Sequence, residues 1–84
     1  MILGTVKGNI VSTRKCDNLV GLKFLVIEPY YGDKSAVFIA ADNLGAGVGE
    51  LVLITTDQTT QYALGKSAPV DACVVGIVDA PPLD

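Results

Sequence analysis

A glycine-rich segment is the first place where this sequence could do chemistry. Residues 42–50 contain Gly45, Gly47 and Gly49 between two apolar runs. Glycine is favoured where the backbone needs a positive φ or where another backbone approaches closely. The spacing agrees with the first two positions of the dinucleotide-binding pattern Gly-x-Gly-x-x-Gly, but the third position is Glu50, and a strand-like run follows in place of a helix. We therefore reject a phosphate-binding loop and keep two interpretations, a plain connection and a contact between copies of the chain.

Phosphate and metal sites are no better supported elsewhere. The segment 65–67 reads Gly-Lys-Ser, like the end of a phosphate loop, but position 60, where that pattern needs glycine, is threonine. The chain contains no histidine, the usual base of a nucleophilic triad and the commonest transition-metal ligand. Its two cysteines, Cys16 and Cys73, form no Cys-x-x-Cys pair. We expect no metal and no cofactor.

Catalysis would have to rest on a thiol or on carboxylates. Cys16 follows Arg14 and Lys15, a basic setting that is typical of reactive thiols, whereas Cys73 lies in an apolar run and is most simply a core residue. Acidic residues at the ends of predicted strands usually cap turns or face solvent, and four are found there: Asp42, Glu50, Asp71 and Asp79. Nothing in their spacing demands a paired-carboxylate site. The sequence does not indicate an enzyme.

The charge balance argues against nucleic acid as the partner. The net charge is −3, the pI is near 4.6, and Lys and Arg together number six, whereas affinity for phosphate backbones comes mostly from these residues. Single-strand binders stack bases on aromatic side chains along a basic groove. Tyr30 and Tyr31 with Lys34 form the one such group, and these residues are more simply the tip of a hairpin. A nucleic-acid-binding module remains the alternative function.

The totals indicate one small domain, residues 1–84. A chain of this length buries only about 60% of its unfolded surface and is marginally stable alone. Its amino terminus does not read as a signal peptide, and no apolar run approaches the roughly 18 residues that a membrane span requires. The two widely separated cysteines do not form a disulfide framework. We expect a soluble intracellular protein that does not enter a membrane.

The pattern of apolar residues predicts five strands, at 2–13, 22–28, 35–41, 51–55 and 70–79. One short helix fits between residues 58 and 64, where Thr55 and Gln58 have the spacing of a capping box and Gly65 can end the helix in the left-handed conformation. This order favours an all-β fold, a small five-stranded Greek-key barrel of the OB type. The helix between the fourth and fifth strands is unusual for that fold.

The apolar content exceeds what such a barrel needs. Hydrophobic residues make up 50% of the chain, and the mean hydropathy is +0.49. An antiparallel strand with one wet face normally alternates, but the predicted second to fifth strands are apolar on both parities. Half a dozen outward Val, Leu or Ile side chains forgo on the order of 10 kcal/mol per chain. This pattern predicts assembly with other subunits; scattered apolar residues on a well-closed barrel are the alternative.

Four segments together resemble a known protein family. They lie at 1–13, 21–25, 41–53 and 69–79, and they include Pro-Val-Asp-Ala at 69–72 and Gly-Ile-Val-Asp at 76–79. In order and spacing they resemble the EutN/CcmL family of bacterial microcompartment vertex proteins over nearly the whole chain. The combination, which includes the glycine-rich segment, is specific, whereas any one segment alone is a weak signal.

The resemblance implies a structural protein of a polyhedral shell. It implies an OB-like barrel that forms a cyclic homopentamer, occupies the fivefold vertices beside hexameric shell proteins, and closes the shell around encapsulated enzymes in the cytoplasm. Carboxysomes and catabolic metabolosomes share these features, so the enclosed pathway stays open. A ring of six remains an alternative to a ring of five, since both use the same type of heterologous interface.

The sequence also departs from the family. Residues 57–61 read Asp-Gln-Thr-Thr-Gln, where the family commonly has a segment like Gly-Ser-Ser-Ala-Arg. The arginine is absent, so no contact that it makes elsewhere is carried over to this chain. The loop at 29–35 and the tail after Asp79 are also short.

The glycine-rich segment then has a specific interpretation. Its small side chains would let subunits approach closely, at the subunit boundary or around an axial pore. The residues expected to lie there are Asp42, Asn43, Gly45, Ala46, Gly47 and Gly49.

Overall fold

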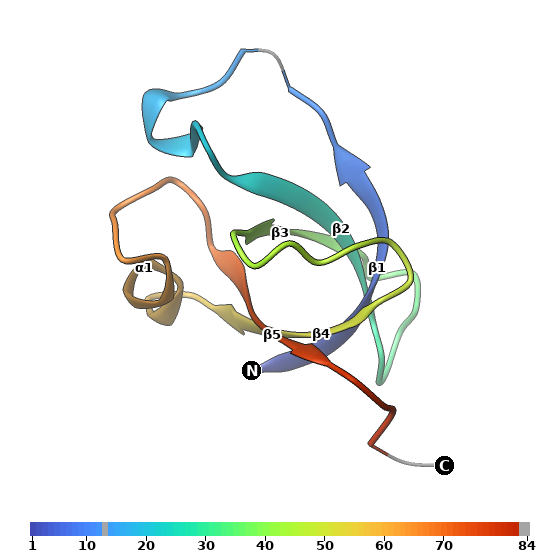
Figure 1. Cartoon of the computed structure of the whole chain (residues 1–84). Coiled ribbons are helices and arrows are strands. Elements are labelled where there is room, and N and C mark those ends of the chain that lie inside the picture. The colour runs from blue at the N-terminus through green and yellow to red at the C-terminus, as the bar shows by residue number, and fades with distance from the viewer. Residues whose placement is uncertain (13, 83–84) are drawn as a thin grey trace.

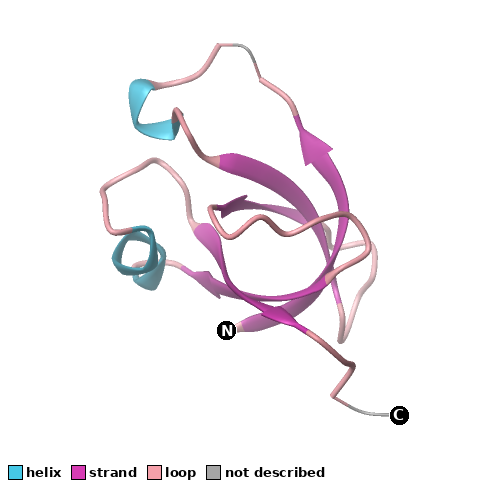
Figure 2. Ribbon diagram, viewed as in Figure 1, coloured by secondary structure: helices cyan, strands magenta, loops and turns pink. Residues whose placement is uncertain are grey.

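A computed structural model describes residues 1–12 and 14–82. Residue 13, where the predicted first strand ended, and residues 83–84 of the predicted domain lie outside the described residues. The chain forms a closed five-stranded barrel with a short helix at one side (Figures 1 and 2). Its elements are β1 (Ile2–Ile10), a 3₁₀ turn η1 (Asp17–Leu19), β2 (Lys23–Pro29), β3 (Phe38–Asp42), β4 (Leu51–Thr56), α1 (Thr59–Leu64) and β5 (Ala72–Val78).

The strand order around the barrel is β1-β2-β3-β5-β4, and β4 pairs again with β1. Every pairing is antiparallel except that of β3 with β5, which is parallel and has the single register pair Ala41–Cys73. This is the Greek-key order of an OB-like barrel, with α1 between β4 and β5. The predicted fold class and the position of the helix are confirmed.

Three predicted strands extend too far. β1 ends at Ile10, β5 covers only Ala72–Val78, and β3 begins at Phe38 rather than at residue 35. Residues 33–36 form a turn instead, because Asp33 accepts hydrogen bonds from the backbone N–H groups of Ser35 and Ala36 through its carboxylate and its carbonyl respectively. Local turn chemistry therefore overrides the apolar pattern at the start of β3.

The helix begins differently from the prediction. No side-chain cap forms at its N-cap residue, Gln58, so the predicted capping box is wrong. The chain turns sharply at Asp57, whose φ is 60°, and the Thr59 hydroxyl donates to the Thr56 carbonyl. Thr55 thus remains in β4 and cannot cap α1. The predicted helix end is confirmed, since Gly65 has a φ of 72° and its N–H donates to the Gln61 and Tyr62 carbonyls.

Alternate residues of the strands fill the barrel interior. The large side chains that are fully buried include Val6, Leu25, Ile27, Val52, Ile54 and Val74. Gly4 lies among them, because a Cβ on Gly4 would collide with the Ile27 side chain and lie 3.0 Å from the Glu28 carbonyl oxygen. The side chains of the described strands therefore fill the barrel interior, as in other small barrels. Within residues 1–12 and 14–82, no helix is long and apolar enough to cross a membrane.

Candidate functional site

The glycine-rich segment forms an arch across one end of the barrel. We use "the arch" for residues 42–50, which join β3 to β4 and cross in front of the barrel in Figure 1. The Asp42 carboxylate, only 1% exposed, holds its first half: Oδ1 accepts from Leu44 N at 2.8 Å, and Oδ2 accepts from Ala46 N at 2.8 Å. Lys23 Nζ, on β2, donates to the Ala46 carbonyl at 2.9 Å. The arch is thus built around one buried carboxylate.

The second half of the arch is tied to β1. Gly49 N donates to the Val6 carbonyl at 2.8 Å, and Val6 N donates to the Glu50 carbonyl at 2.9 Å. The Glu50 carboxylate also accepts from Gly47 N at 2.6 Å. Gly45 and Gly49 have φ values of 89° and 92°, which disfavour any other residue type. Two of the three glycines therefore serve the fold of the arch itself.

The six predicted site residues fall into two groups. Asp42 and Ala46 point inward, and Ala46 is 0% exposed and belongs to the hydrophobic core. Asn43, Gly45 and Gly49 are exposed and Gly47 is half-buried, so these four line the outer surface of the arch. Asp42 and Ala46 therefore hold the arch from inside the subunit, and they offer no side chain to a neighbour.

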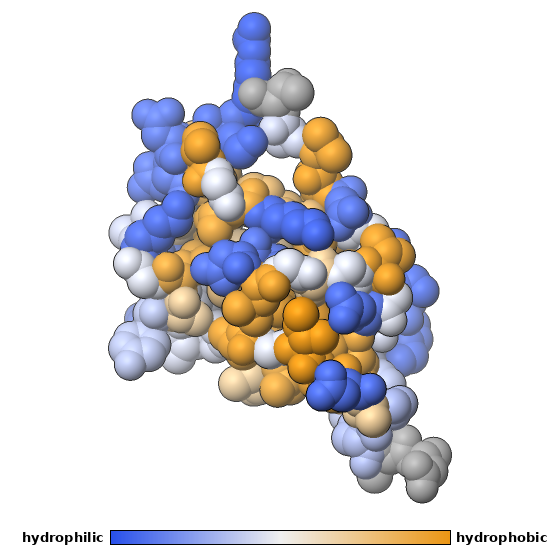
Figure 3. All heavy atoms as spheres, viewed as in Figure 1, coloured by the Kyte–Doolittle hydropathy of each residue, from blue (hydrophilic) through white to orange (hydrophobic). Residues whose placement is uncertain are grey.

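Sequence reasoning missed two outward apolar side chains of the arch. Leu44 and Val48 are both exposed, at the two ends of the Gly45–Gly47 segment. The signal that could have found them is an apolar residue in a segment predicted as a loop, where no strand buries it. On β5, Val75 and Ile77 are also exposed. Figure 3 shows apolar side chains gathered over β5, beside the arch.

A second apolar surface covers the outer wall of β1, β2 and β3. Gly8 pairs with Val26, which pairs with Ile39, so these residues form one outward row across three strands. Ile10 and Phe24 form the row beside it. Ile39 is 53% exposed, and Ile10 is also exposed. The prediction that the strands leave apolar side chains uncovered on the barrel's exterior is confirmed.

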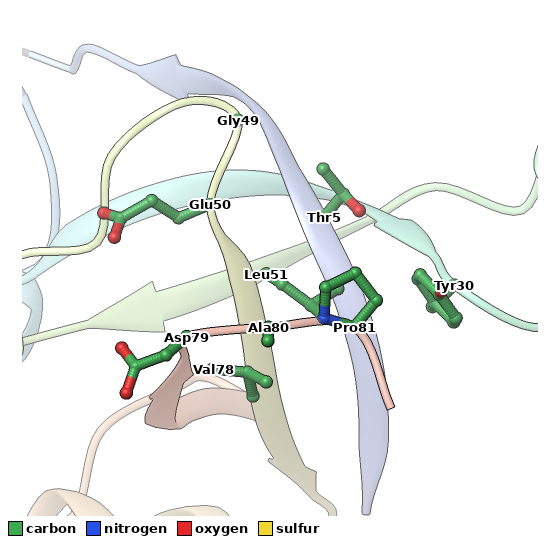
Figure 4. A pocket seen from close by; sticks show the side chains of 9 residues that line it. All are labelled: Thr5, Tyr30, Gly49, Glu50, Leu51, Val78, Asp79, Ala80 and Pro81. Atoms are coloured by element: carbon green, nitrogen blue, oxygen red, sulfur yellow. The ribbon is translucent and has the colours of Figure 1, made fainter. Parts of the chain in front are cut away.

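Two open grooves mark the surface. One, of about 440 Å³, lies over the start of β4, with Thr5, Tyr30, Leu51, Val78 and Pro81 among its lining residues. In Figure 4 the Glu50 and Asp79 carboxylates point to one side of β4, away from Tyr30 and Pro81. The other groove, of about 550 Å³, lies where β3 and β5 diverge and is lined by Phe38, Ile39, Asp57, Asp71 and others. Each groove is lined by two carboxylates, those of Glu50 and Asp79 in the first groove and those of Asp57 and Asp71 in the second.

The two thiols lie in different environments. Cys16 is exposed in the β1–β2 connection, and Cys73 is buried. Burial raises the pKa of the Cys73 thiol, and the nearby Asp42 carboxylate raises it further, so Cys73 stays protonated. Within the described part of the chain, no group of three or more Cys, Asp or Glu side chains could hold a metal ion.

The tyrosine pair does not form a stacking platform. The rings of Tyr30 and Tyr31 meet edge to face, with centroids 4.9 Å apart. Lys34 Nζ donates to the Pro29 and Tyr30 carbonyls and lies 5.3 Å from the centroid of the Tyr30 ring. The edge-to-face ring contact and the Lys34 hydrogen bonds hold these residues together as a loop tip, which does not favour the nucleic-acid alternative.

The barrel, the arch and the uncovered apolar walls define a class: a small OB-like barrel that leaves apolar side chains exposed on its outer surface. The family model described as "Ethanolamine utilisation protein EutN/carboxysome" matches residues 1–79. This chain belongs to the EutN/CcmL family, as the resemblance in its sequence predicted. The family consists of structural shell vertex proteins, not enzymes.

Individual relatives agree over nearly full length. The "Bacterial microcompartment shell vertex protein GrpN" of Rhodospirillum rubrum is 40% identical over 84 residues, which cover 94% of this chain and 93% of that protein. The "Bacterial microcompartment shell vertex protein PduN" of Salmonella typhimurium is 38% identical over 87 residues, which cover 94% of this chain and 96% of that protein. The solved structure titled "GrpN pentameric microcompartment shell protein from Rhodospirillum rubrum" has a TM-score of 0.84 at 33% identity and covers 100% and 99% of the two chains.

Proposed function

We propose that this chain is a structural vertex component of a bacterial microcompartment shell and that it assembles into a cyclic homopentamer. The observation that carries the proposal is the family match over residues 1–79, with relatives named as shell vertex proteins and a structural relative titled as pentameric. The uncovered apolar walls give the chain a physical reason to assemble. The ring sits among hexameric shell proteins at the vertices of the shell, in the bacterial cytoplasm.

The size of the surface is consistent with a ring. Each member of a cyclic ring uses two different surfaces, one for each neighbour. At about 800 Å² per partner in each interface, a subunit would bury about 1,600 Å². That is close to a third of its accessible surface of 5226 Å². Burial on this scale would cover the apolar side chains that the isolated barrel leaves in water.

The arch lies at the subunit boundary or beside the symmetry axis in this proposal. Asn43, Gly45, Gly47 and Gly49 provide its outer surface, and Asp42 and Ala46 keep it rigid from within. A preorganised loop loses little conformational entropy on association. The arch is thus ready for a neighbour before the ring forms.

The mass of the purified protein in solution tests the proposal. Light scattering is expected to give about five times the subunit mass of 8.7 kDa. Native mass spectrometry then separates a ring of five from a ring of six. A strict monomer at micromolar concentration would contradict the proposal.

Substituting Gly47→Leu tests the position of the arch. Gly47 has no positive φ, and a Cβ there would meet only Glu50 Oε1, at 3.4 Å, so the isolated subunit tolerates a side chain. We expect the variant to fold but to assemble poorly. Ala36→Leu, at an exposed position in the β2–β3 loop, is the control and should assemble normally. If the Gly47→Leu protein still forms a complete ring, the arch is an ordinary connection between β3 and β4 and does not lie at a subunit contact.

A further inference from the structure

The strand pairing of the barrel is incomplete between β3 and β5. These two strands run parallel and share a single register pair, Ala41 with Cys73. β3 begins before that pair, at Phe38, and on its other side it pairs along its whole length with β2. Among the described backbone hydrogen bonds outside the strand pairs, none joins residues 38–40 to another segment. The edge of β3 that faces β5 is therefore unpaired before Ala41.

Hydrogen bonds on the opposite side hold this gap open. If the parallel register continued, the residues before Ala72 would lie beside the start of β3. The Asp71 carbonyl instead accepts from Asp57 N at 3.0 Å, and the Val70 carbonyl accepts from Gln61 Nε2 at 2.9 Å. The chain that leads into β5 is thus tied to the β4–α1 turn and to α1, which lies beside it in Figure 1.

The groove of about 550 Å³ lies over this gap, and we call it the β3 groove. Part of its lining is apolar, because Phe38 and Ile2 pack half-buried against the core and Ile39 is 53% exposed. The rest includes two exposed carboxylates, those of Asp57 and Asp71. Among the described residues that line the groove, none is lysine or arginine. The groove therefore combines an apolar surface with uncompensated negative charge.

An unpaired strand edge beside a groove can bind an extended peptide, which adds a strand to the sheet. Main-chain hydrogen bonds give such a complex its affinity, and alternate side chains of the peptide give it specificity. In the β3 groove, apolar side chains would pack on Phe38 and Ile39, and basic side chains would lie near Asp57 and Asp71. Opposite charges across an interface fix its register and disfavour other partners. The lining therefore favours a peptide that alternates apolar residues with lysine or arginine.

We propose that the β3 groove binds an extended basic peptide of another protein, which pairs with the free edge of β3 and places its lysine or arginine side chains beside Asp57 and Asp71. The proposal goes beyond the structural role in the shell, because it gives each subunit a peptide-binding site. It does not depend on the number of subunits in the ring.

Hydrogen exchange with synthetic peptides tests the proposal on the wild-type protein. The probe is a short acetylated peptide in which valine alternates with lysine. The same peptide with glutamate in place of lysine is the charge control, and the same peptide with every amide N-methylated is the backbone control. NMR measures exchange residue by residue. We expect the lysine peptide to slow exchange of the unpaired N–H groups within residues 38–40, and neither control peptide to do so.

Acidic variants test the charged part of the groove. Asp57→Gly removes one carboxylate, and glycine suits the φ of 60° at this position, so the subunit is expected to fold. Asp71→Asn removes the other. Each should weaken binding of the lysine peptide several-fold at low salt. Asp17→Asn is the matched control, because Asp17 is exposed, does not line the groove and carries the same charge, and this variant should bind as wild type does.

Ile39→Lys tests the apolar part, because it places a positive charge on the exposed side chain beside the free edge of β3. We expect this variant to lose binding of the lysine peptide. Val20→Lys is its control, since Val20 is 61% exposed in the β1–β2 connection, outside the groove, and binding should be retained. Circular dichroism confirms the folding of each variant.

Three results would overturn the proposal. The first is equal binding of the lysine and glutamate peptides, and the second is wild-type affinity in both Asp57→Gly and Asp71→Asn. The third is slow exchange throughout residues 38–40 of the assembled protein without peptide, which would mean that another copy of the chain already covers the edge. A monomeric protein that binds the peptide would contradict only the proposed ring, whereas a complete ring that does not bind it would contradict only the peptide site.

Discussion

The arch and the β2–β3 loop use the same turn chemistry in two different settings. In the arch, Asp42 Oδ1 accepts from the N–H two residues later, at 2.8 Å; in the loop, Asp33 Oδ1 accepts from Ser35 N at 2.9 Å. The carboxylate of Asp42 is buried, whereas Asp33 is exposed. A buried donor that loses its acceptor cannot turn to water, whereas an exposed one can. Hydrogen bonds of similar length should therefore contribute very differently to the free energy of unfolding.

Removing the two carboxylates should give the largest difference. Asp42→Ala leaves Ala46 N without its acceptor at a buried site and Leu44 N without one at a half-buried site, and we expect a loss of about 3 kcal/mol in the free energy of unfolding. Asp33→Ala should change it little, because water replaces the carboxylate. Urea unfolding of both variants measures the difference. Equal losses from the two substitutions would mean that burial does not distinguish the loops.

Alanine residues in the two loops offer the next comparison. Ala46 lies in the core cluster, so Ala46→Leu overpacks the barrel end and is expected to cost about 1–3 kcal/mol. Ala36 is exposed in the β2–β3 loop, and Ala36→Leu should be close to neutral. Thermal or urea unfolding of the two variants tests whether the side chain of Ala46 packs in the core, in addition to the hydrogen bonds that hold the arch. If Ala46→Leu leaves the free energy of unfolding unchanged, the arch can move away from the core to make room for the larger side chain.

The sequence predicted the strands of this fold but not the inner side of the arch. Alternating residues placed the first strand, short apolar runs placed the other four, and the excess of apolar residues predicted uncovered walls such as Ile39. The burial of Asp42 depends on where the last residue of β3 meets the core, which a pattern within one segment does not contain. Asp42 was therefore predicted at a subunit contact, although its side chain points inward.

Gly45, Gly47 and Gly49 were interpreted as one cluster, but the glycines of this chain have separate physical roles. Gly45 and Gly49 have positive φ values, and Gly4 lies where a Cβ would collide with Ile27. Gly8 and Gly47 have neither a positive φ nor a crowded Cβ position. A sequence shows the residue type but not φ or the surrounding atoms. The structure was therefore needed to see that Gly8 lies at the register shift of β1, where a glycine is typical of a β-bulge.

Replacing a glycine with a positive φ should cost the same stability in the arch and in the β2–β3 loop. Gly45 and Gly32 have φ values of 89° and 85°, and a Cβ on either meets no other atom within 4 Å. Gly45→Ala and Gly32→Ala should each cost about 1–2 kcal/mol from the left-handed backbone alone. Urea unfolding again provides the measurement. A much larger loss for Gly45→Ala would show that the hydrogen bonds of the buried Asp42 break when the backbone of the arch shifts.

The smallest effect concerns the pH dependence of the exposed loop. The Ser35 hydroxyl and then the Ser35 N–H donate to Asp33, and these hydrogen bonds lower the pKa of the Asp33 carboxyl below its ordinary value. A carboxyl with a lowered folded-state pKa stabilises the fold above its unfolded-state pKa and loses that contribution as the pH falls through its folded-state pKa. The stability difference between wild type and Asp33→Asn should therefore be present at about pH 7 and be lost as the pH falls through the lowered folded-state pKa of Asp33.

Ser35→Ala separates the two causes of this shift. It removes the hydroxyl, which lowers the pKa most, but keeps the backbone N–H, so an NMR titration should show the pKa of Asp33 moving up only part of the way toward its ordinary value. A pKa that does not move would mean that the hydroxyl of Ser35 hydrogen-bonds to water in solution. The hydrogen bond to Asp33 would then be lost to competing water, because Asp33 is exposed. The hydrogen bonds of Asp42 should persist, because its carboxylate is buried.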